Sequence, residues 1–317
     1  MKSWQKEAVG VEIFSKGARF VRLSFRKDKV ELKDFGEKIF PKEPLDFQWL
    51  ADELGRFLSG ARVKITFLGQ SSQSYRLGLP ERILSAGEEQ LKWELAQKVS
   101  SSSSEYDFFI NSAGKEFFLG TAVRKEAFER VAVPFAQKGN FDLSFTSAGF
   151  ALVNLFLSSS LPREDSAVLV NLGEDFTTLV VLDKGELTYV SEIAVPPGLS
   201  ALPEGELAST QKILRESLLE RFGIELSTLI HLLGFRATET GRIETVYLSG
   251  PGVTLGDLSA SIGQMGGVQV GHLTPPVTFP EGETPERWVV ATGLAMAALN
   301  EGNPSLQPGY SVLGAGL

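Results

Sequence analysis

Residues 166–190, SAVLVNLGEDFTTLVVLDKGELTYV, place a glycine turn and polar side chains at the end of a strongly apolar stretch. Gly173 lets the backbone turn tightly, so that amide groups can face an anion, and Thr177 and Thr178 add hydroxyl groups. Many proteins hold a nucleotide phosphate in this way. Asn171 stands where a carboxylate would organise a metal ion, and it brings no negative charge to a cation. The stretch predicts the shape of a phosphate loop and leaves its activity open.

Other common site chemistries find little support. The chain has no cysteine, which excludes disulfides and thiolate catalysis, and its two histidines are His231 and His272. Two distant histidines support neither a Ser-His-Asp arrangement nor a histidine metal site. Glu88 and Glu89 are adjacent on a predicted helix and do not face each other. We therefore predict no catalytic residue and no metal ligand of these types.

Composition narrows the class of protein further. The chain of 317 residues is 43% hydrophobic, enough for more than one compact domain, and carries a net charge of −8. No basic patch overrides this charge, so we expect no nucleic-acid partner. No run of eighteen or more apolar residues occurs, and the first ten residues lack the apolar core of a signal peptide. We expect a cytoplasmic protein without direct membrane insertion.

One supersecondary pattern occurs twice along the chain. Residues 8–15, 18–25 and 29–40 have the composition of strands, residues 44–58 have apolar side chains at helical spacing, and residues 61–69 have the composition of a buried strand. Strands at 166–173, 176–183 and 186–195, a helix at 204–223 and a strand at 244–250 repeat this order. Two copies of one pattern predict a duplicated α/β protein.

A different unit lies between the two copies. Residues 79–99 and 124–139 are predicted helices, and residues 106–110, 116–123 and 141–149 have strand-like segments. The serine run at 100–104 is interpreted as a flexible loop. These patterns predict a first lobe over 1–79, an inserted α+β subdomain over 80–144, a return to the first lobe over 145–163, a second lobe over 164–290, and a C-terminal helix packing on the first lobe with a loose tail over 291–317.

Three motifs in this order resemble the actin-like ATPase superfamily. They are VGVEIFSKGARFVRLSF at the first phosphate loop, VLVNLGEDFTTLVVLDKGEL at the second, and VYLSGPGVTLGDLSASI at the adenosine turn. Within the superfamily the chain is similar to the PilM family of type IV pilus assembly proteins, with FtsA and the cytoplasmic part of GspL as cousins. The resemblance implies an α/β fold of the actin-like ATPase (ribonuclease H-like) type, duplicated, with an inserted small α+β subdomain.

The resemblance also implies a function. A PilM-like chain would be a cytoplasmic scaffold of a bacterial inner-membrane platform for type IV pili, peripheral to the membrane through its partners. It would bind the N-terminal peptide of a bitopic, PilN-like protein and communicate with a pilus or secretion motor ATPase, and a homo-oligomer stays open. Two alternatives stay open, namely a GspL-like component of a type II secretion system and an active ATPase or kinase of the same fold.

The tail, interrupted by Pro308, Gly309, Gly314 and Gly316, cannot form the amphipathic membrane helix of FtsA.

The cofactor implied by the resemblance is ATP with Mg²⁺. The matching positions are Glu12, Ser15, Asn171, Gly173, Thr177, Thr178, Gly250 and Gly252. Phe14 replaces a glycine and puts a ring where a phosphate would approach, and Pro251 removes a backbone donor. We therefore expect degenerate nucleotide loops and a partner peptide as the ligand. Six aromatic side chains of the first lobe and insert have two possible interpretations. They either line the groove for the partner peptide or belong to the hydrophobic core. They are Phe14, Trp93, Phe108, Phe109, Phe117 and Phe118.

Overall fold

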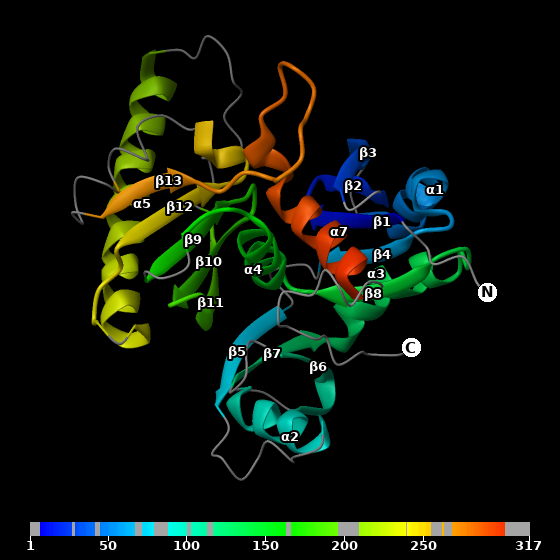
Figure 1. Ribbon diagram of the computed structural model, residues 1–317, viewed down its shortest axis with the longest axis horizontal. Helices are drawn as coiled ribbons and strands as arrows, with labels where there is room; N and C mark the ends of the chain where they lie inside the picture. Colours follow the sequence, from blue (N-terminus) through cyan, green and yellow to red (C-terminus); the bar gives the residue numbers. More distant parts are fainter. Residues whose placement is uncertain are drawn as a thin grey trace. The chain divides into compact units, whose positions relative to one another are not determined.

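A five-stranded mixed sheet forms the centre of each of two units (Figure 1). The computed structural model describes residues 7–26, 29–41, 45–66, 72–78, 88–99, 103–112, 117–162, 166–195, 209–238, 240–254, 262 and 268–301. Unit 1 comprises Met1–Ser160 and Pro275–Leu317, and unit 2 comprises Leu161–Thr274. Each unit has a hydrophobic core of its own.

The sheet of unit 1 has the strand order β3-β2-β1-β4-β8. Its strands are β1 (Glu7–Phe14), β2 (Gly17–Arg26), β3 (Lys29–Ile39), β4 (Arg62–Thr66) and β8 (Asp142–Thr146). The first three strands are antiparallel neighbours, whereas β1, β4 and β8 run parallel. Alternation along each strand sends apolar side chains to both faces of the sheet, so both faces need a covering layer.

Helices α1 (Phe47–Leu58) and α3 (Lys125–Ala136) cover one face of this sheet. Leu50, Leu54 and Leu58 of α1 are fully buried, in agreement with their spacing along the sequence. Asp46 caps α1, because its Oδ1 accepts a hydrogen bond from the amide of Trp49 at 2.9 Å. The expected helix therefore forms, and it begins three residues later than the pattern suggested.

Helix α7 (Val289–Glu301), preceded by the short helix η5 (Pro285–Trp288), covers the opposite face (Figure 1). The backbones of α7 and β1 approach so closely that a Cβ at Gly10 would lie 1.9 Å from the carbonyl oxygen of Ala291. Helix α4 (Ala148–Ser158) packs on α7, and a Cβ at Gly293 would lie 2.2 Å from the carbonyl oxygen of Ala151. The small residues of α7 thus permit helix-to-sheet and helix-to-helix contact at backbone distance.

The sheet of unit 2 repeats the topology of unit 1, with the order β11-β10-β9-β12-β13. Its strands are β9 (Ala167–Leu172), β10 (Phe176–Asp183), β11 (Glu186–Ala194), β12 (Thr245–Ser249) and β13 (Gln269–His272). Lys184 and Gly185 both have positive φ and form the two-residue turn between β10 and β11. Helix α5 (Ser209–Ala237) covers one face through Phe222, Leu226 and Ile230. The duplicated α/β pattern is confirmed.

A small sheet of order β5-β7-β6 belongs to unit 1. It contains β5 (Ser72–Gly78), β6 (Tyr106–Ser112) and β7 (Phe117–Arg124), and helix α2 (Glu88–Lys98) packs on it. Leu77, Leu91, Leu95 and Ile110 form the core of this subdomain. The short helix η3 (Ser103–Glu105) leads into β6, so Ser103 and Ser104 of the serine run are helical rather than part of a flexible loop.

The boundaries differ from the expected ones in three places. Strand β5 pairs with β7 and so belongs to the subdomain sheet, although it precedes residue 80. Strand β8 pairs with β4 in the main sheet of unit 1, and residues 275–290 cluster with unit 1 rather than with unit 2. The pattern also gave no sign of α4, which is buried on all sides and has no polar face. Residues 302–317, the expected loose tail, lie outside the described residues.

Among the helices that the structure describes, none combines the length and the apolar character needed to cross a membrane.

Candidate functional site

A row of polar side chains crosses the unit 2 sheet at the end where β9 and β12 finish. The register places Thr178 of β10 opposite Asn171 of β9 on one side and Glu192 of β11 on the other. Ser249 of β12 lies beside Asn171, and its hydroxyl donates to Asn171 Oδ1 at 3.3 Å. We call Ser249, Asn171, Thr178 and Glu192 the unit-2 row. The row offers the oxygen atoms of one amide, two hydroxyl groups and one carboxyl group. Glu192 is its one ionisable residue.

The glycine turn after Asn171 is closed by its own backbone. The amide of Gly173 donates to the carbonyl oxygen of Phe176 at 3.1 Å, so this group is used within the turn. A Cβ at residue 173 would lie 2.5 Å from the same carbonyl oxygen, which explains the glycine. The turn keeps the expected strand-glycine-strand shape, and the amide of Gly173 has a partner inside it.

Gly250 and Gly252 follow β12 and pack on the end of β9. Gly250 has a φ of +91°, a conformation that favours glycine, and a Cβ there would lie 2.7 Å from the carbonyl oxygen of Leu172. A Cβ at Gly252 would lie 2.8 Å from Leu172 Cβ. Packing inside unit 2 therefore requires both glycines, whether or not an adenosine binds here.

Thr177 and Thr178 do not share a face of the sheet. Thr177 pairs with Leu172 and Ile193 and lies on the face that α5 covers, where it is fully buried. Thr178 lies on the opposite face, in the unit-2 row. Successive residues of a strand alternate between faces, so the two hydroxyl groups cannot serve one ligand together.

A charged row occupies the matching place in unit 1. Arg19 of β2 lies opposite Glu12 of β1 and Glu37 of β3. Its Nε is 3.0 Å from Glu37 Oε1, its Nη1 is 3.7 Å from Glu12 Oε2, and only 1% of its side chain is exposed. Arg287 of η5 adds a contact of 2.6 Å to Glu37 Oε2. We call Glu12, Arg19 and Glu37 the unit-1 row; with Arg287 it has no net charge.

Phe14 and Ser15 complete the first turn. Phe14 is 6% exposed, and the guanidinium carbon of Arg19 lies 4.5 Å from its ring centroid. The ring therefore supports the arginine of the unit-1 row. Ser15 lies on the surface, in the turn between β1 and β2. The amide of Ile13 in the same turn region donates to Thr66 Oγ1 at 2.9 Å.

Glu192 was not predicted from the sequence. Part of its side chain is exposed, but Oε2 is buried and, within the described part of the chain, has no hydrogen-bond partner. Burial raises the pKa of the carboxyl from 4.5 to about 7. Glu37, its counterpart in the repeat, has Arg19 opposite, whereas Glu192 has Thr178. Burial is the physical reason for the raised pKa, and the threonine that faces Glu192 brings no positive charge to offset it.

The structure thus divides the sequence-predicted residues between the units. Asn171, Gly173, Thr177, Thr178, Gly250 and Gly252 gather at one end of the unit 2 sheet, whereas Glu12 and Ser15 belong to unit 1. The residues that sequence reasoning missed are Arg19, Glu37, Ser249 and Glu192. A signal for Arg19 existed, because the same number of residues separates Glu12 from Arg19 as Asn171 from Thr178. Among the described residues, no group of three or more His, Asp and Glu side chains could hold a metal ion.

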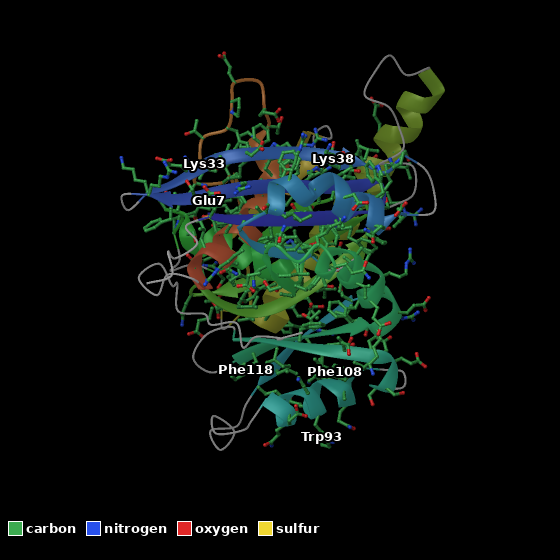
Figure 2. All side chains as sticks on the ribbon, turned by 90° about the vertical axis from the view of Figure 1, so that its right-hand side faces the viewer. Glu7, Lys33, Lys38, Trp93, Phe108 and Phe118 are labelled. Carbon is green, nitrogen blue, oxygen red and sulfur yellow. The ribbon has the colours of Figure 1, made fainter. Side chains whose placement is uncertain are left out.

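The aromatic candidates fall into two groups. Phe109 packs in the main core of unit 1, and Phe108 and Phe118 pack against the core of the subdomain. Trp93 is 65% exposed and projects from the outer side of α2, as Figure 2 shows. The side chain of Phe117 lies outside the described residues. The core interpretation therefore holds for most of these rings, and Trp93 is the exposed one among those described.

Comparisons with known proteins agree with this architecture. No protein-family model matches the chain, and no curated protein matches it by sequence. Its structure is similar to a chain of the solved PilM-PilN type IV pilus biogenesis complex, with 18% identity over 92% of this chain and 98% of that chain, and a TM-score of 0.72. A Bacteroides thetaiotaomicron protein described as having an actin-like ATPase fold and unknown function matches at 10% identity over 85% of this chain and 91% of its own, with a TM-score of 0.53.

A third similar structure, an inorganic polyphosphate/ATP-glucomannokinase from an Arthrobacter strain, matches at 12% identity over 92% of this chain and 98% of its own, with a TM-score of 0.50. The range of these proteins, from a pilus complex to a kinase, means that the likeness concerns architecture and not one activity. Two repeated sheets of identical topology and these matches lead to one conclusion: the chain has the actin-like ATPase fold, in a form similar to that of the PilM-PilN complex.

Proposed function

We propose that this chain is a cytoplasmic scaffold of an inner-membrane platform for type IV pili and binds a short peptide of a bitopic, PilN-like membrane protein. One observation carries the proposal: the similarity to a chain of the PilM-PilN complex extends over 92% of this chain and 98% of that one, with a TM-score of 0.72. The partner would hold the scaffold at the membrane, near the motor ATPase of the machine.

The proposed scaffold does not hydrolyse ATP. Mg²⁺ in nucleotide sites is held by carboxylates, water and phosphate oxygens. Glu12, the acid at the first loop, pairs with Arg19, and Asn171 at the second loop is a neutral amide that accepts from Ser249. The amide of Gly173 is bonded within its own turn. These groups do not fit a Mg²⁺–nucleotide, and we derive no catalytic step from them.

We place the partner contact on the subdomain of unit 1, at Trp93. A tryptophan that is 65% exposed contributes little to the core, and tryptophan is enriched among residues that dominate binding energies. Lys92 and Glu94 flank it on α2 and provide a charged rim around an apolar centre. This surface suits a peptide with one or two apolar anchors.

Calorimetric titration tests the proposal with the N-terminal cytoplasmic peptide of a PilN-like bitopic protein from the same organism. We expect binding at micromolar strength or tighter for the wild type, and binding about tenfold weaker for Trp93→Ala. Val133→Ala is the matched control, because Val133 is also exposed, at 48%, but lies on α3. Binding equal in all three proteins would remove Trp93 from the interface, and no binding to wild type would contradict the scaffold.

A separate titration with Mg²⁺–ATP tests the nucleotide part of the proposal. We expect no turnover above that of the buffer and no micromolar binding, with or without the peptide. Steady hydrolysis by wild type that Asn171→Ala abolishes would show that the second loop is active and would favour the ATPase alternative over the scaffold.

A further inference from the structure

Three matching strand positions carry different side chains in the two units. Glu12 and Asn171 occupy matching places on β1 and β9, Arg19 and Thr178 on β2 and β10, and Glu37 and Glu192 on β3 and β11. The unit-2 row therefore has one acid and no base. The unit-1 row has two acids with one base between them. Unit 2 thus serves as a reference for the same strand positions with threonine in place of arginine.

We infer that Arg19 is a built-in counter-ion, which takes in the first loop the place that a divalent cation would otherwise need. This inference rests on the part of the proposed function that denies the first loop a role in holding Mg²⁺–ATP. It is independent of the partner peptide. It goes beyond the proposed function because it names Arg19 as the group that balances the charge of Glu12 and Glu37 in place of a metal ion.

Three contacts fix Arg19 in this role. Its Nε is 3.0 Å from Glu37 Oε1 and its Nη1 is 3.7 Å from Glu12 Oε2, so one guanidinium faces a carboxylate on either side. The ring of Phe14 lies 4.5 Å from the guanidinium carbon and supports it from a third direction. A planar, permanently charged group suits such a place better than lysine would.

The replacement of glycine by phenylalanine at residue 14 then has a physical reason. In unit 2 the matching residue is Gly173, whose amide bonds to the carbonyl of Phe176 and which leaves no side chain near the row. In unit 1 the aromatic ring of Phe14 is buried at 6% exposure and lies against Arg19. Phe14 and Arg19 therefore act as a pair, because the ring keeps water from the guanidinium and strengthens its attraction to the carboxylates.

The network also reaches the segment that precedes α7. Arg287 of η5 contacts Glu37 Oε2 at 2.6 Å, and Trp288 beside it packs edge-on against Phe35 of β3 with ring centroids 5.0 Å apart. Removal of Arg19 would take from Glu12 the guanidinium that faces it from β2, while Glu37 would keep Arg287.

Thermal unfolding of the full chain tests the inference, with MgCl₂ as the probe and NaCl of equal ionic strength as the blank. Arg19→Thr copies the unit-2 residue, and we expect it to lower Tm by roughly 10 °C. We expect 10 mM MgCl₂ to recover about 3–6 °C of that loss, and to leave wild type unchanged within about 1 °C. Arg22→Thr is the matched control, because Arg22 lies on the same strand and pairs with Glu7, with 22% of its side chain exposed; it should show no magnesium response.

The double variant Glu12→Asn with Arg19→Thr reproduces the unit-2 pair and should recover most of the lost Tm without magnesium. If Arg19→Thr does not fold, recovery of folding by the double variant supports the inference, and failure of both variants overturns it. A magnesium response of wild type equal to that of Arg19→Thr also overturns it. So does stabilisation of wild type, but not of Arg19→Thr, by metal-free ATP, because Arg19 would then be an anion ligand. None of these outcomes depends on peptide binding or on turnover.

Discussion

The buried carboxyl of Glu192 should make the stability of this protein depend on pH near neutrality. Burial raises its pKa from 4.5 to about 7, and Oε2 has no hydrogen-bond partner within the described residues. Because the folded-state pKa lies above the unfolded value, the folded protein binds this proton more tightly. The contribution of this carboxyl to the free energy of unfolding is therefore fully present below pH 4.5. It is lost as the pH rises toward and through about 7.

The size of the effect follows from the shift. A change from 4.5 to about 7 corresponds to about 3.4 kcal/mol as an upper value, at about 1.4 kcal/mol for each pH unit. The side chain is partly exposed, so solvent reduces this, and we expect about 1–3 kcal/mol. Glu192→Gln keeps the shape of the protonated side chain and removes the charge. The variant should exceed wild type by less than about 1 kcal/mol near pH 5 and by about 1–3 kcal/mol at pH 8.5.

Urea unfolding at four pH values between 5 and 8.5 measures this difference. Glu186→Gln is the control, because Glu186 is an exposed residue at the other end of β11, and its effect should stay within about 0.5 kcal/mol at every pH. A difference between Glu192→Gln and wild type that is constant across the pH range would refute the reasoning. It would show that another group stabilises the carboxylate in the folded state.

Three glycines give further predictions, each measured by urea unfolding at constant pH. Gly10→Ala should cost about 3 kcal/mol or more, because its Cβ would lie 1.9 Å from the backbone oxygen of Ala291; a loss below about 1 kcal/mol would contradict the close packing of α7 on β1. Gly250→Ala should cost about 2–4 kcal/mol, because φ is +91° and the Cβ would approach Leu172; a neutral effect would mean that the turn relaxes freely. Gly55→Ala in α1 should instead stabilise by about 0.5–1 kcal/mol, because nothing lies within 4 Å of its Cβ, and destabilisation would reveal a contact there.

Local patterns were sufficient for most of the fold. Strands β1, β2, β3, β9, β10 and β11 lie within about two residues of their predicted limits, because β-branched and aromatic residues were bounded by short polar turns. Strand β5 escaped notice because SQSYRLG is mostly polar, and its place in a sheet depends on the pairing with β7. Helix α5 continues well beyond residue 223, the predicted end, through Gly223 and Gly234. Gly223 marked the predicted end, but the packing of Leu226 and Ile230 on the sheet sustains the helix.

The candidate site was less predictable than the fold. The turn at Gly173 and the glycines after β12 were visible as motifs, because conformation at a glycine is a local property. The unit-1 row was not visible, because Glu12, Arg19 and Glu37 meet only through the register of three strands. The raised pKa of Glu192 depends on burial, which a linear sequence does not contain.

The sequence by itself determined the repeated order of strands and helices, the neutral amide at residue 171 and the aromatic side chain at residue 14. These depend on residue type and on short-range periodicity. Tertiary structure alone decided that Arg19 lies between two acids while Glu192 faces a threonine. The reason is physical: the energy of a charge depends on the atoms around it and on its distance from water, and strand pairing sets both.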